Sequence, residues 1–210
     1  MAFDYVRNPD AITRLSFKRI RAEAKLSHLP GLMDAVAERV VHAVASVEAA
    51  DHLRFSEGAA EAAREALVQG APVLVDVEMV SRGITRKFLP ADNGVICCLS
   101  GAGVADEAKA RGETRSAVGV ERWGERMNGG LVVIGNAPTA LFRVLEIILD
   151  GGPKPAAILG FPVGFVGAAE SKQALMEYAG DIPFITLDGR LGGSPVAAAA
   201  LNAIALGGNP

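Results

Sequence analysis

Short apolar runs alternate with longer amphipathic segments from about residue 70 onwards. Each run has four or five residues, the usual length of a buried strand, and the segments between them carry apolar residues at helical spacing. Strands of this kind, separated by helices, indicate a parallel sheet covered on both faces. We therefore expect strands at Val73–Val77, Val95–Leu99, Leu131–Ile134, Ala156–Leu159 and Phe184–Leu187. We expect helices at Val104–Arg111, Thr114–Arg126, Thr139–Asp150, Ala168–Ala179 and Val196–Leu206.

The first 70 residues show helix signals instead. Asn8 followed by Pro9 is typical of an N-cap with proline in the first helical turn. Three helices are expected, from Pro9 to about Leu26, from Gly31 to about Ser46 and from about Ser56 to Gly70. The predicted fold is α/β: a three-layer, doubly wound, mostly parallel sheet of about five strands, preceded by an N-terminal helical layer. No linker is visible in the 210 residues, so we expect a single domain over residues 1–210.

The composition narrows the class of protein. Half of the residues are hydrophobic and 21% are charged, and the formal net charge of −3 argues against a general nucleic-acid binder, which is normally basic. No run approaches ~18 apolar residues, so no membrane span is expected. The N-terminal sequence has acidic residues and no apolar core, which does not fit a secretory signal. The two cysteines, Cys97 and Cys98, are adjacent, which argues against a disulfide scaffold and favours a cytoplasmic location.

The turns that follow the expected strands are candidate binding segments, because open parallel sheets bind ligands beyond the carboxyl ends of their strands. No GxxxxGK[ST] or GxSxG motif occurs, which excludes a P-loop nucleotidase and removes the commonest serine hydrolase signature. Gly101-Ala102-Gly103 is an incomplete dinucleotide fingerprint, since Asp106 stands at its sixth position. It leaves an NAD-dependent oxidoreductase open as an alternative to a plain tight turn. The candidate turns are 100–103, 135–139, 160–164 and 189–195.

The three histidines, His28, His42 and His52, are too scattered for a metal site, so no metal is expected. His42 stands out because it projects to roughly the opposite side from the apolar stripe of its helix. It is either an ordinary solvated side chain or one that faces a cleft or a subunit interface. A single histidine can hold and release a proton near neutral pH without a metal. Its neighbours on that helix face are Ala35, Glu38, Arg39 and Ser46.

The first expected helix carries a basic stripe. Its members fall at positions i, i+4, i+7 and i+11, which places them on one face. Such a stripe is either a solvated surface or a wall that faces an anionic ligand. The four residues are Arg14, Lys18, Arg21 and Lys25.

Two further segments supply cations. Arg115 lies in the first turn of a helix that Thr114 is expected to cap, and the helix dipole disfavours a cation there. An anion shared between Arg115 and the helix N-terminus would remove this conflict. Thr85-Arg86-Lys87 adds two cations in an expected loop. Together with the helix starts, these cations suit a large ligand with several carboxylates.

Eight ordered stretches of the sequence resemble the precorrin-8X methylmutase (precorrin isomerase) family of the cobalamin pathway. The resemblance covers nearly the whole chain and is weakest over Ser100–Gly112. The stretches are Ser16-Phe17 with Ile20–Ala24, Val41–Ala43, Gly70–Pro72 with Asp76–Val80, Gly83–Arg86, Thr114–Ala117, Ile134–Phe142, Gly160–Lys172 and Gly189–Ser194.

The resemblance implies an isomerase that converts precorrin-8X to hydrogenobyrinic acid, or its cobalt counterpart. One methyl group moves between adjacent carbons of ring C by an acid-assisted 1,5-sigmatropic shift, without a cofactor. By the same resemblance His42 is the acid. Substrate contacts are expected at Ser16, Arg21, Thr85, Arg86, Arg115 and Asn136.

The resemblance also implies a homodimer with the active site near the subunit interface. That interface would give the non-core face of the His42 helix a partner. The polycarboxylate substrate would account for the basic stripe and for Arg115. A non-catalytic tetrapyrrole carrier, which holds the product for the next enzyme, stays open as a second alternative.

Overall fold

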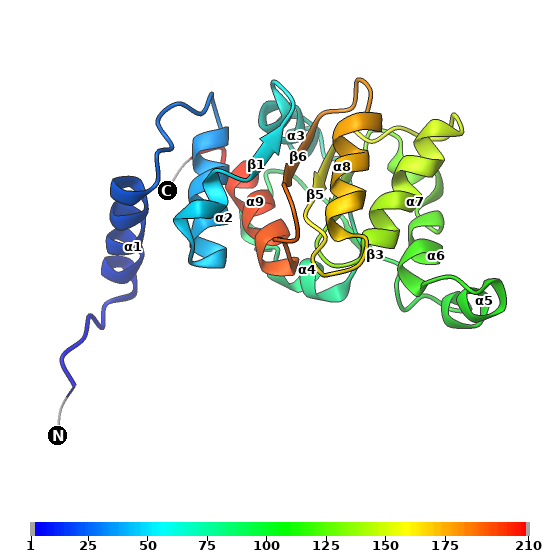
Figure 1. The fold of residues 1–210 in the computed structure, drawn as a ribbon, viewed down its shortest axis with the longest axis horizontal. Helices are drawn as coiled ribbons and strands as arrows, with labels where there is room; N and C mark the ends of the chain where they lie inside the picture. Colours follow the sequence, from blue (N-terminus) through cyan, green and yellow to red (C-terminus); the bar gives the residue numbers. More distant parts are fainter. Residues whose placement is uncertain (1–2, 209–210) are drawn as a thin grey trace.

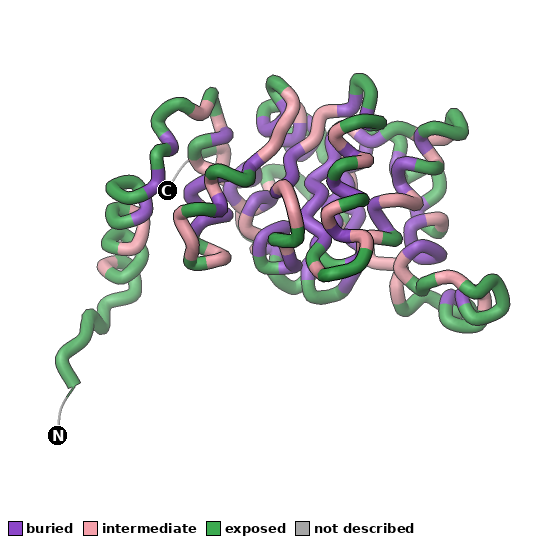
Figure 2. Tube along the Cα trace, in the orientation of Figure 1, coloured by how far each residue is buried: buried purple, intermediate pink, exposed green. Residues whose placement is uncertain are grey.

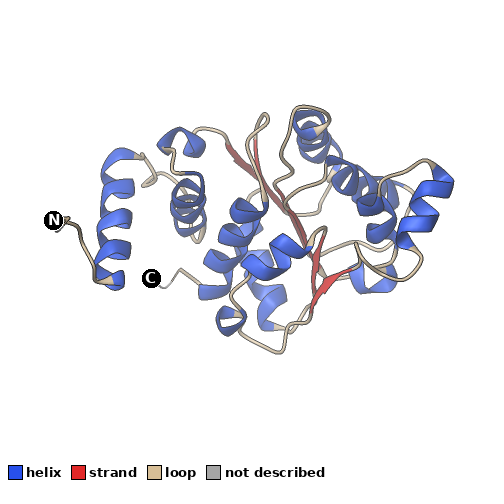
Figure 3. Ribbon diagram, turned by 90° about the horizontal axis from the view of Figure 1, so that it is seen from below, coloured by secondary structure: helices blue, strands red, loops and turns tan. Residues whose placement is uncertain are grey.

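A six-stranded sheet forms the centre of the computed structural model, which describes residues 3–208 (Figures 1 and 3). The strand order is β1-β6-β5-β4-β2-β3. Five strands are parallel and β1 pairs antiparallel with β6. The strands are β1 (Leu53–Phe55), β2 (Val73–Val75), β3 (Val95–Cys97), β4 (Leu131–Ile134), β5 (Ala157–Gly160) and β6 (Phe184–Leu187). The predicted parallel α/β sheet is confirmed.

The edge strand β1 is the difference from the predicted five strands. It has three residues with Arg54 in the middle, which is too short to give a periodic signal. Ser56 was expected at the start of a helix but continues the edge pairing with β6, since its hydroxyl accepts a 2.9 Å hydrogen bond from the Phe184 amide. The helix begins at Ala59 instead, after Gly58 in the left-handed conformation (φ 69°).

The helices lie close to their predicted positions. Asn8 caps the first by accepting a hydrogen bond from the Ala11 amide, and Thr114 caps another by accepting from Ala117. The segment 114–126, predicted as one helix, breaks into α6 and a 3₁₀ turn. The α-helices are α1 (Pro9–Glu23), α2 (Met33–Val44), α3 (Ala59–Val68), α4 (Glu78–Gly83), α5 (Val104–Arg111), α6 (Arg115–Glu121), α7 (Pro138–Leu149), α8 (Ala168–Tyr178) and α9 (Ser194–Leu206), and the 3₁₀ turns are η1 (Val47–Ala50), η2 (Arg86–Phe88) and η3 (Gly124–Met127).

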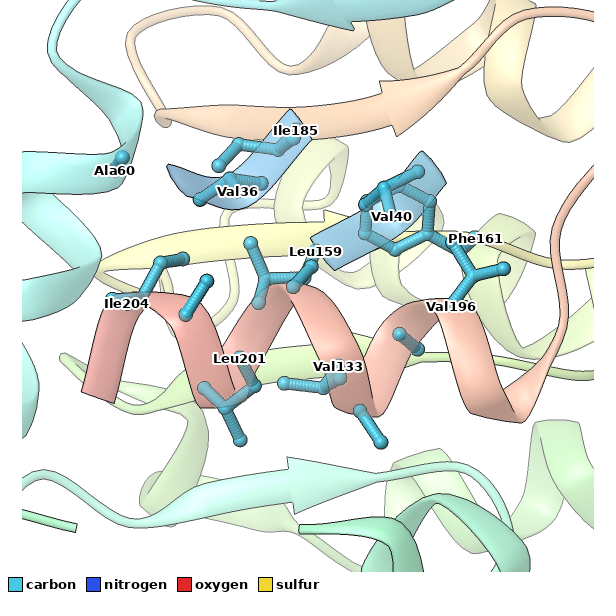
Figure 4. Close-up of a cluster of buried hydrophobic side chains, with 14 of the residues drawn as sticks. Val36, Val40, Ala60, Val133, Leu159, Phe161, Ile185, Val196, Leu201 and Ile204 are labelled. Atoms are coloured by element: carbon cyan, nitrogen blue, oxygen red, sulfur yellow. The ribbon is translucent and has the colours of Figure 1, made fainter. Parts of the chain in front are cut away.

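Helices cover both faces of the sheet, as predicted. In β4, Val133 packs into one apolar cluster with α2, α3 and α9, while Val132 packs into a second cluster with α7 and α8. Figure 4 shows the first cluster, in which side chains of α9 meet Val36 and Val40 of α2 and the strand residues Val133, Leu159 and Ile185. The central strands and the helix faces turned towards them are buried (Figure 2). The sheet with its two helical layers is thus the predicted three-layer arrangement.

The N-terminal helices extend this arrangement outwards on one side. Helix α2 packs on α9, and α1 packs on α2 at the end of the molecule, where most of its surface is exposed (Figures 1 and 2). Ile20 is the buried residue of α1. The predicted N-terminal helical layer is therefore present, and its outer helix has one neighbour to hold it in place.

Candidate active site

His42 lies near the C-terminal end of α2, on the face that meets α1. Its Nδ1 atom is 2.9 Å from the hydroxyl oxygen of Ser16, which α1 presents one turn before the buried Ile20. A hydroxyl can donate to a neutral ring nitrogen and can accept from a protonated one. Ser16 can therefore hold the imidazole in both protonation states, and Nε2 is left for a ligand. The structure brings together the predicted acid and the predicted contact Ser16.

Phe17 connects His42 to a cation that the sequence prediction did not select. The rings of Phe17 and His42 meet edge to face with centroids 5.4 Å apart, and the Arg39 guanidinium lies 5.4 Å from the Phe17 centroid. Arg39 precedes His42 by three residues on α2 and is half-buried. Among residues 3–208 no carboxylate forms an ion pair with it, and burial lowers its pKa. Arg39 is thus an unpaired cation one side chain away from the candidate acid.

A groove with a volume of about 540 Å³ opens beside His42. Its walls come from α1, from the segment before α1, and from the end of α2 with the start of η1, and they include Val6, Ile12, Ser16 and Val47. His42 is exposed on this groove rather than packed in the core. The sequence left open a solvated side chain or one that faces a cleft or a subunit interface, and in the structure the exposed side chain lines a groove.

Arg21 is engaged with a carboxylate of its own chain. Its Nε and a terminal nitrogen donate to the two oxygens of Glu38 at 2.5 and 3.1 Å. This two-point pairing raises the pKa of Arg21, chiefly through the hydrogen bond. Glu38 is buried, so removal of Arg21 would leave a buried charge without a partner. The predicted basic stripe is therefore interrupted at Arg21, whose charge is matched by Glu38.

Asn136 lies at the carboxyl end of the sheet, where the chain order reverses between β2 and β4. In many sheets of this class the reversal opens a ligand crevice. Here Asp76, which is 3% exposed, accepts hydrogen bonds of 2.8 to 2.9 Å from the amides of Gly135, Asn136 and Ala137. Burial raises the pKa of Asp76, and the three amides oppose this shift. Asp76 thus joins the two strand ends and leaves the Asn136 side chain exposed.

Thr85 immediately precedes η2, and Arg86 is the first residue of this 3₁₀ turn, which follows α4. The Thr85 amide donates to the Asn202 side chain of α9 at 2.9 Å, and Arg86 donates to the Ser81 hydroxyl at 3.1 Å. Arg86 is exposed and Thr85 is half-buried. Within the described part of the chain, no hydrogen bond or ion pair joins either residue to Ser16 or His42.

Arg115 is separated from His42 by most of the width of the molecule. It is the first residue of α6, which lies at the opposite end from α1 and α2 in Figure 1. It is exposed and has no ion pair among residues 3–208. One chain therefore does not bring Arg115 to the groove that contains Ser16 and His42.

Sequence reasoning missed two functional candidates, for different reasons. Arg39 shares the helix face of His42, so the helical period could have singled it out, but its lack of a carboxylate partner is visible only in three dimensions. Asp76 follows a strand, which is a usual place for a functional carboxylate, yet its partners lie about 60 residues further along the chain. Neither the missing partner of Arg39 nor the long-range partners of Asp76 leave a local signal in the sequence.

Two searches of the described residues bear on cofactors and membranes. Over residues 3–208, no group of three or more His, Cys, Asp or Glu side chains could hold a metal ion. No helix in the same range has both the length and the apolar character needed to cross a membrane.

Comparisons with known proteins decide the family. The family model described as precorrin-8X methylmutase matches residues 11–206. The chain belongs to this family. It is 54% identical over 202 residues to the precorrin-8X methylmutase of Pseudomonas aeruginosa, covering 96% of this chain and 97% of that one. It is 37% identical to the cobalt-precorrin-8 methylmutase of Priestia megaterium, covering 94% of this chain and 88% of that one.

A solved structure agrees in fold. The precorrin-8X methylmutase of Thermus thermophilus superposes with a TM-score of 0.84 at 39% identity, covering 93% of this chain and 94% of that one. Membership of the precorrin-8X methylmutase family confirms the predicted resemblance. It also leaves Gly101-Ala102-Gly103 as a tight turn that leads into α5, and it removes the oxidoreductase alternative.

Proposed function

We propose that this chain is an isomerase of cobalamin biosynthesis that moves a methyl group within precorrin-8X. The main support for this proposal is the hydrogen-bonded pair of His42 and Ser16, which lies on a groove in a chain of the precorrin-8X methylmutase family. A relative named for precorrin-8X is 54% identical, whereas one named for cobalt-precorrin-8 is 37% identical. We therefore take the metal-free compound as the substrate.

His42 acts as the acid through Nε2. Donation of a proton to the macrocycle makes its conjugated system electron-poor, which eases the 1,5-sigmatropic shift of the methyl group between adjacent carbons of ring C. Loss of a proton from the macrocycle then restores the charge and leaves the product, an isomer of the substrate. Ser16 at Nδ1 fixes the ring orientation before and after the proton is transferred. The reaction as written needs no cofactor.

The substrate is a polycarboxylate, so cations hold it in position. Arg39 binds one carboxylate beside His42, since all of its N–H donors are free of carboxylates within residues 3–208. Ser16, Thr85, Arg86, Arg115 and Asn136 are further substrate contacts. Arg21 is also a proposed contact. Two of its nitrogens already donate to Glu38, so it contacts the substrate only through its remaining N–H donors.

A second copy of the chain completes the site. Two observations support a homodimer: Arg115 lies far from His42 within one chain, and the groove beside His42 is bordered by exposed apolar residues. Among the residues that line the groove, Val6 is 46% exposed, Ile12 48% and Leu15 38%. Contiguous exposed apolar side chains of this kind are typical of a covered surface. We propose that the partner's Arg115 faces the groove of His42. We also propose a single domain over residues 1–210 and a cytoplasmic location.

Mixed dimers test this arrangement. His42→Ala and Arg115→Ala are co-expressed with different tags, and turnover is measured at substrate concentrations below KM. In a two-fold symmetric dimer, a mixed pair has one site with both residues intact. Random pairing makes about half of the dimers mixed, so about one quarter of the wild-type activity should return. If the mixture is no more active than its parents, Arg115 does not act across the interface.

A spectroscopic assay separates catalysis from the carrier alternative. Methyl migration extends the conjugation of the macrocycle, so the visible spectrum of precorrin-8X changes when purified enzyme is added. A spectrum that stays unchanged although the ligand is bound would leave only a tetrapyrrole carrier. A matched His42→Gln sample shows whether the change depends on the proposed acid.

A further inference from the structure

Lys172 of α8 is the one buried lysine or arginine among residues 3–208, and the site described above does not use it. Its residue exposure is 0%. Its Nζ donates a 2.6 Å hydrogen bond to the carbonyl oxygen of Leu191, between β6 and α9. Within the described residues no carboxylate forms an ion pair with it. Burial lowers the pKa of Lys172 to about 8, and the charge of Asp188 opposes this shift. An unpaired buried cation is unfavourable, so its presence indicates a role other than packing.

The loop that Lys172 holds, residues 188–193, is also joined to the loop that follows β5. The Gly193 amide donates to the Phe161 carbonyl at 2.8 Å. Gly192 has no room for a side chain, because a Cβ atom would lie 2.5 Å from the carbonyl oxygens of Phe161 and Pro162. The ammonium group and two backbone contacts therefore fix this loop at the carboxyl end of the sheet.

These two loops present an apolar surface with one cation. Phe165 is 83% exposed, Val166 89% and Leu191 42%. The Arg190 guanidinium stacks over the Phe165 ring at 5.3 Å from its centroid. Aromatic and aliphatic side chains next to a cation match a ligand that has a flat apolar face and carboxylates at its edge. Arg190 and Leu191 belong to the loop that Lys172 holds, so their positions depend on it.

We propose that Lys172 is a positioning residue, whose bond to the Leu191 carbonyl holds Arg190 and Leu191 in the arrangement that binds the macrocycle. This inference rests on the proposed function for the identity of the ligand. Lys172 itself touches no substrate, since it is fully buried. Its effect reaches the ligand through the 188–193 loop.

The test compares Lys172→Met with Lys109→Met, which removes the same charge from an exposed position on α5. Methionine has nearly the length of lysine and no donor, so the core stays filled. We expect Lys172→Met to raise amide hydrogen exchange at least tenfold in residues 189–193 and to leave residues 135–137, which Asp76 holds, unchanged. The KM for precorrin-8X and the dissociation constant of hydrogenobyrinic acid should rise about tenfold, while kcat changes little. Lys109→Met should match the wild type in all of these measurements.

Two results would overturn the proposal. The first is wild-type exchange in residues 189–193 of Lys172→Met, together with an unchanged KM. The second is faster exchange throughout the protein with a lowered free energy of unfolding, which would assign Lys172 to core stability alone. The exchange measurement needs no ligand, so it stands even if the wild-type protein fails to bind the product. That failure would count against the proposed function rather than against the role of Lys172.

Discussion

Two half-buried arginines, at opposite ends of the molecule, have opposite surroundings. Arg143 of α7 lies among three carboxylates, with distances of 3.0 Å to Glu113, 3.3 Å to Glu121 and 3.2 Å to Glu146. Arg39 of α2 has an aromatic ring as its neighbour and no carboxylate partner among residues 3–208. The first belongs to a network that joins α5, α6 and α7, and the second lies beside the candidate acid.

The difference shows why net charge is a poor guide to ligand binding. The α5–α7 region combines Arg111, Arg122 and Arg143 with four glutamates, so its cations are neutralised within the fold. In the α1–α2 region Arg21 is neutralised by Glu38, whereas the half-buried Arg39 has no ion pair among residues 3–208, and neither do the exposed Arg14, Lys18 and Lys25. Cations without carboxylate partners, rather than the local number of cations, indicate where an anionic ligand binds, and Arg39 is the half-buried one beside the candidate acid.

The largest expected effect comes from replacing His42, the proposed acid, which lies in the α1–α2 region beside Arg39. His42→Gln should lower kcat by about 10²- to 10⁴-fold, because it removes general acid catalysis, while the dissociation constant of the product changes little. Rapid-mixing turnover assays and product titration measure the two quantities. His52→Gln, at an exposed position outside the groove, is the matched control. Near-normal turnover in His42→Gln would contradict the assignment of the acid.

The next largest effect is on the affinity for the product, which should depend on Arg39 and not on Arg143. Arg39→Met should weaken product binding about tenfold, since a charged hydrogen bond to a carboxylate is lost. The free energy of unfolding should change little, because Arg39 has no ion pair in the described chain to lose. Fluorescence titration at two salt concentrations measures the binding, and the loss should be larger at low salt. Wild-type affinity in this variant would show that Arg39 does not contact the ligand.

For Arg143, which is paired with carboxylates, we expect a loss of stability without a loss of product binding. Arg143→Met should lower the free energy of unfolding by about 1–2 kcal/mol, because three carboxylates lose a common partner. Product binding should stay at the wild-type value. Urea unfolding and the same titration check both. If Arg143→Met weakens binding as much as Arg39→Met does, the contrast between the two regions is wrong.

The last prediction concerns a third cation, Lys172, and the pH dependence of its contribution to stability. Its pKa in the folded protein is about 8, below the ordinary lysine value of 10.5, so between these values the unfolded chain binds more protons. This group therefore makes the free energy of unfolding rise as the pH rises from about 8 to about 10.5. Lys172→Met lacks this contribution, and the stability difference between variant and wild type should move in favour of the wild type over that range. Urea unfolding at several pH values measures it, and a constant difference would contradict the buried charge.

Most of the fold could be predicted because its signals are local. Apolar runs bounded by turns marked five of the six strands, and Asn8 and Thr114 marked two helix starts through caps that reach only three residues. The edge strand β1 was missed because three residues with a central arginine carry no period, and its pairing with β6 spans over 130 residues of sequence. Long-range pairing of a short segment leaves no mark on the segment itself.

The order of residues along the chain was sufficient to predict the layered α/β fold, the non-core face of His42 and the resemblance to the precorrin-8X methylmutase family. Each follows from local periodicity or from ordered motifs. The three-dimensional arrangement was needed to show that Arg21 is bound by Glu38, that Arg39 has no ion pair among residues 3–208, that Asp76 joins two strand ends and that Lys172 donates to the Leu191 carbonyl. The physical reason is that the state of a charge depends on its neighbours within a few ångströms, and here those neighbours come from different elements.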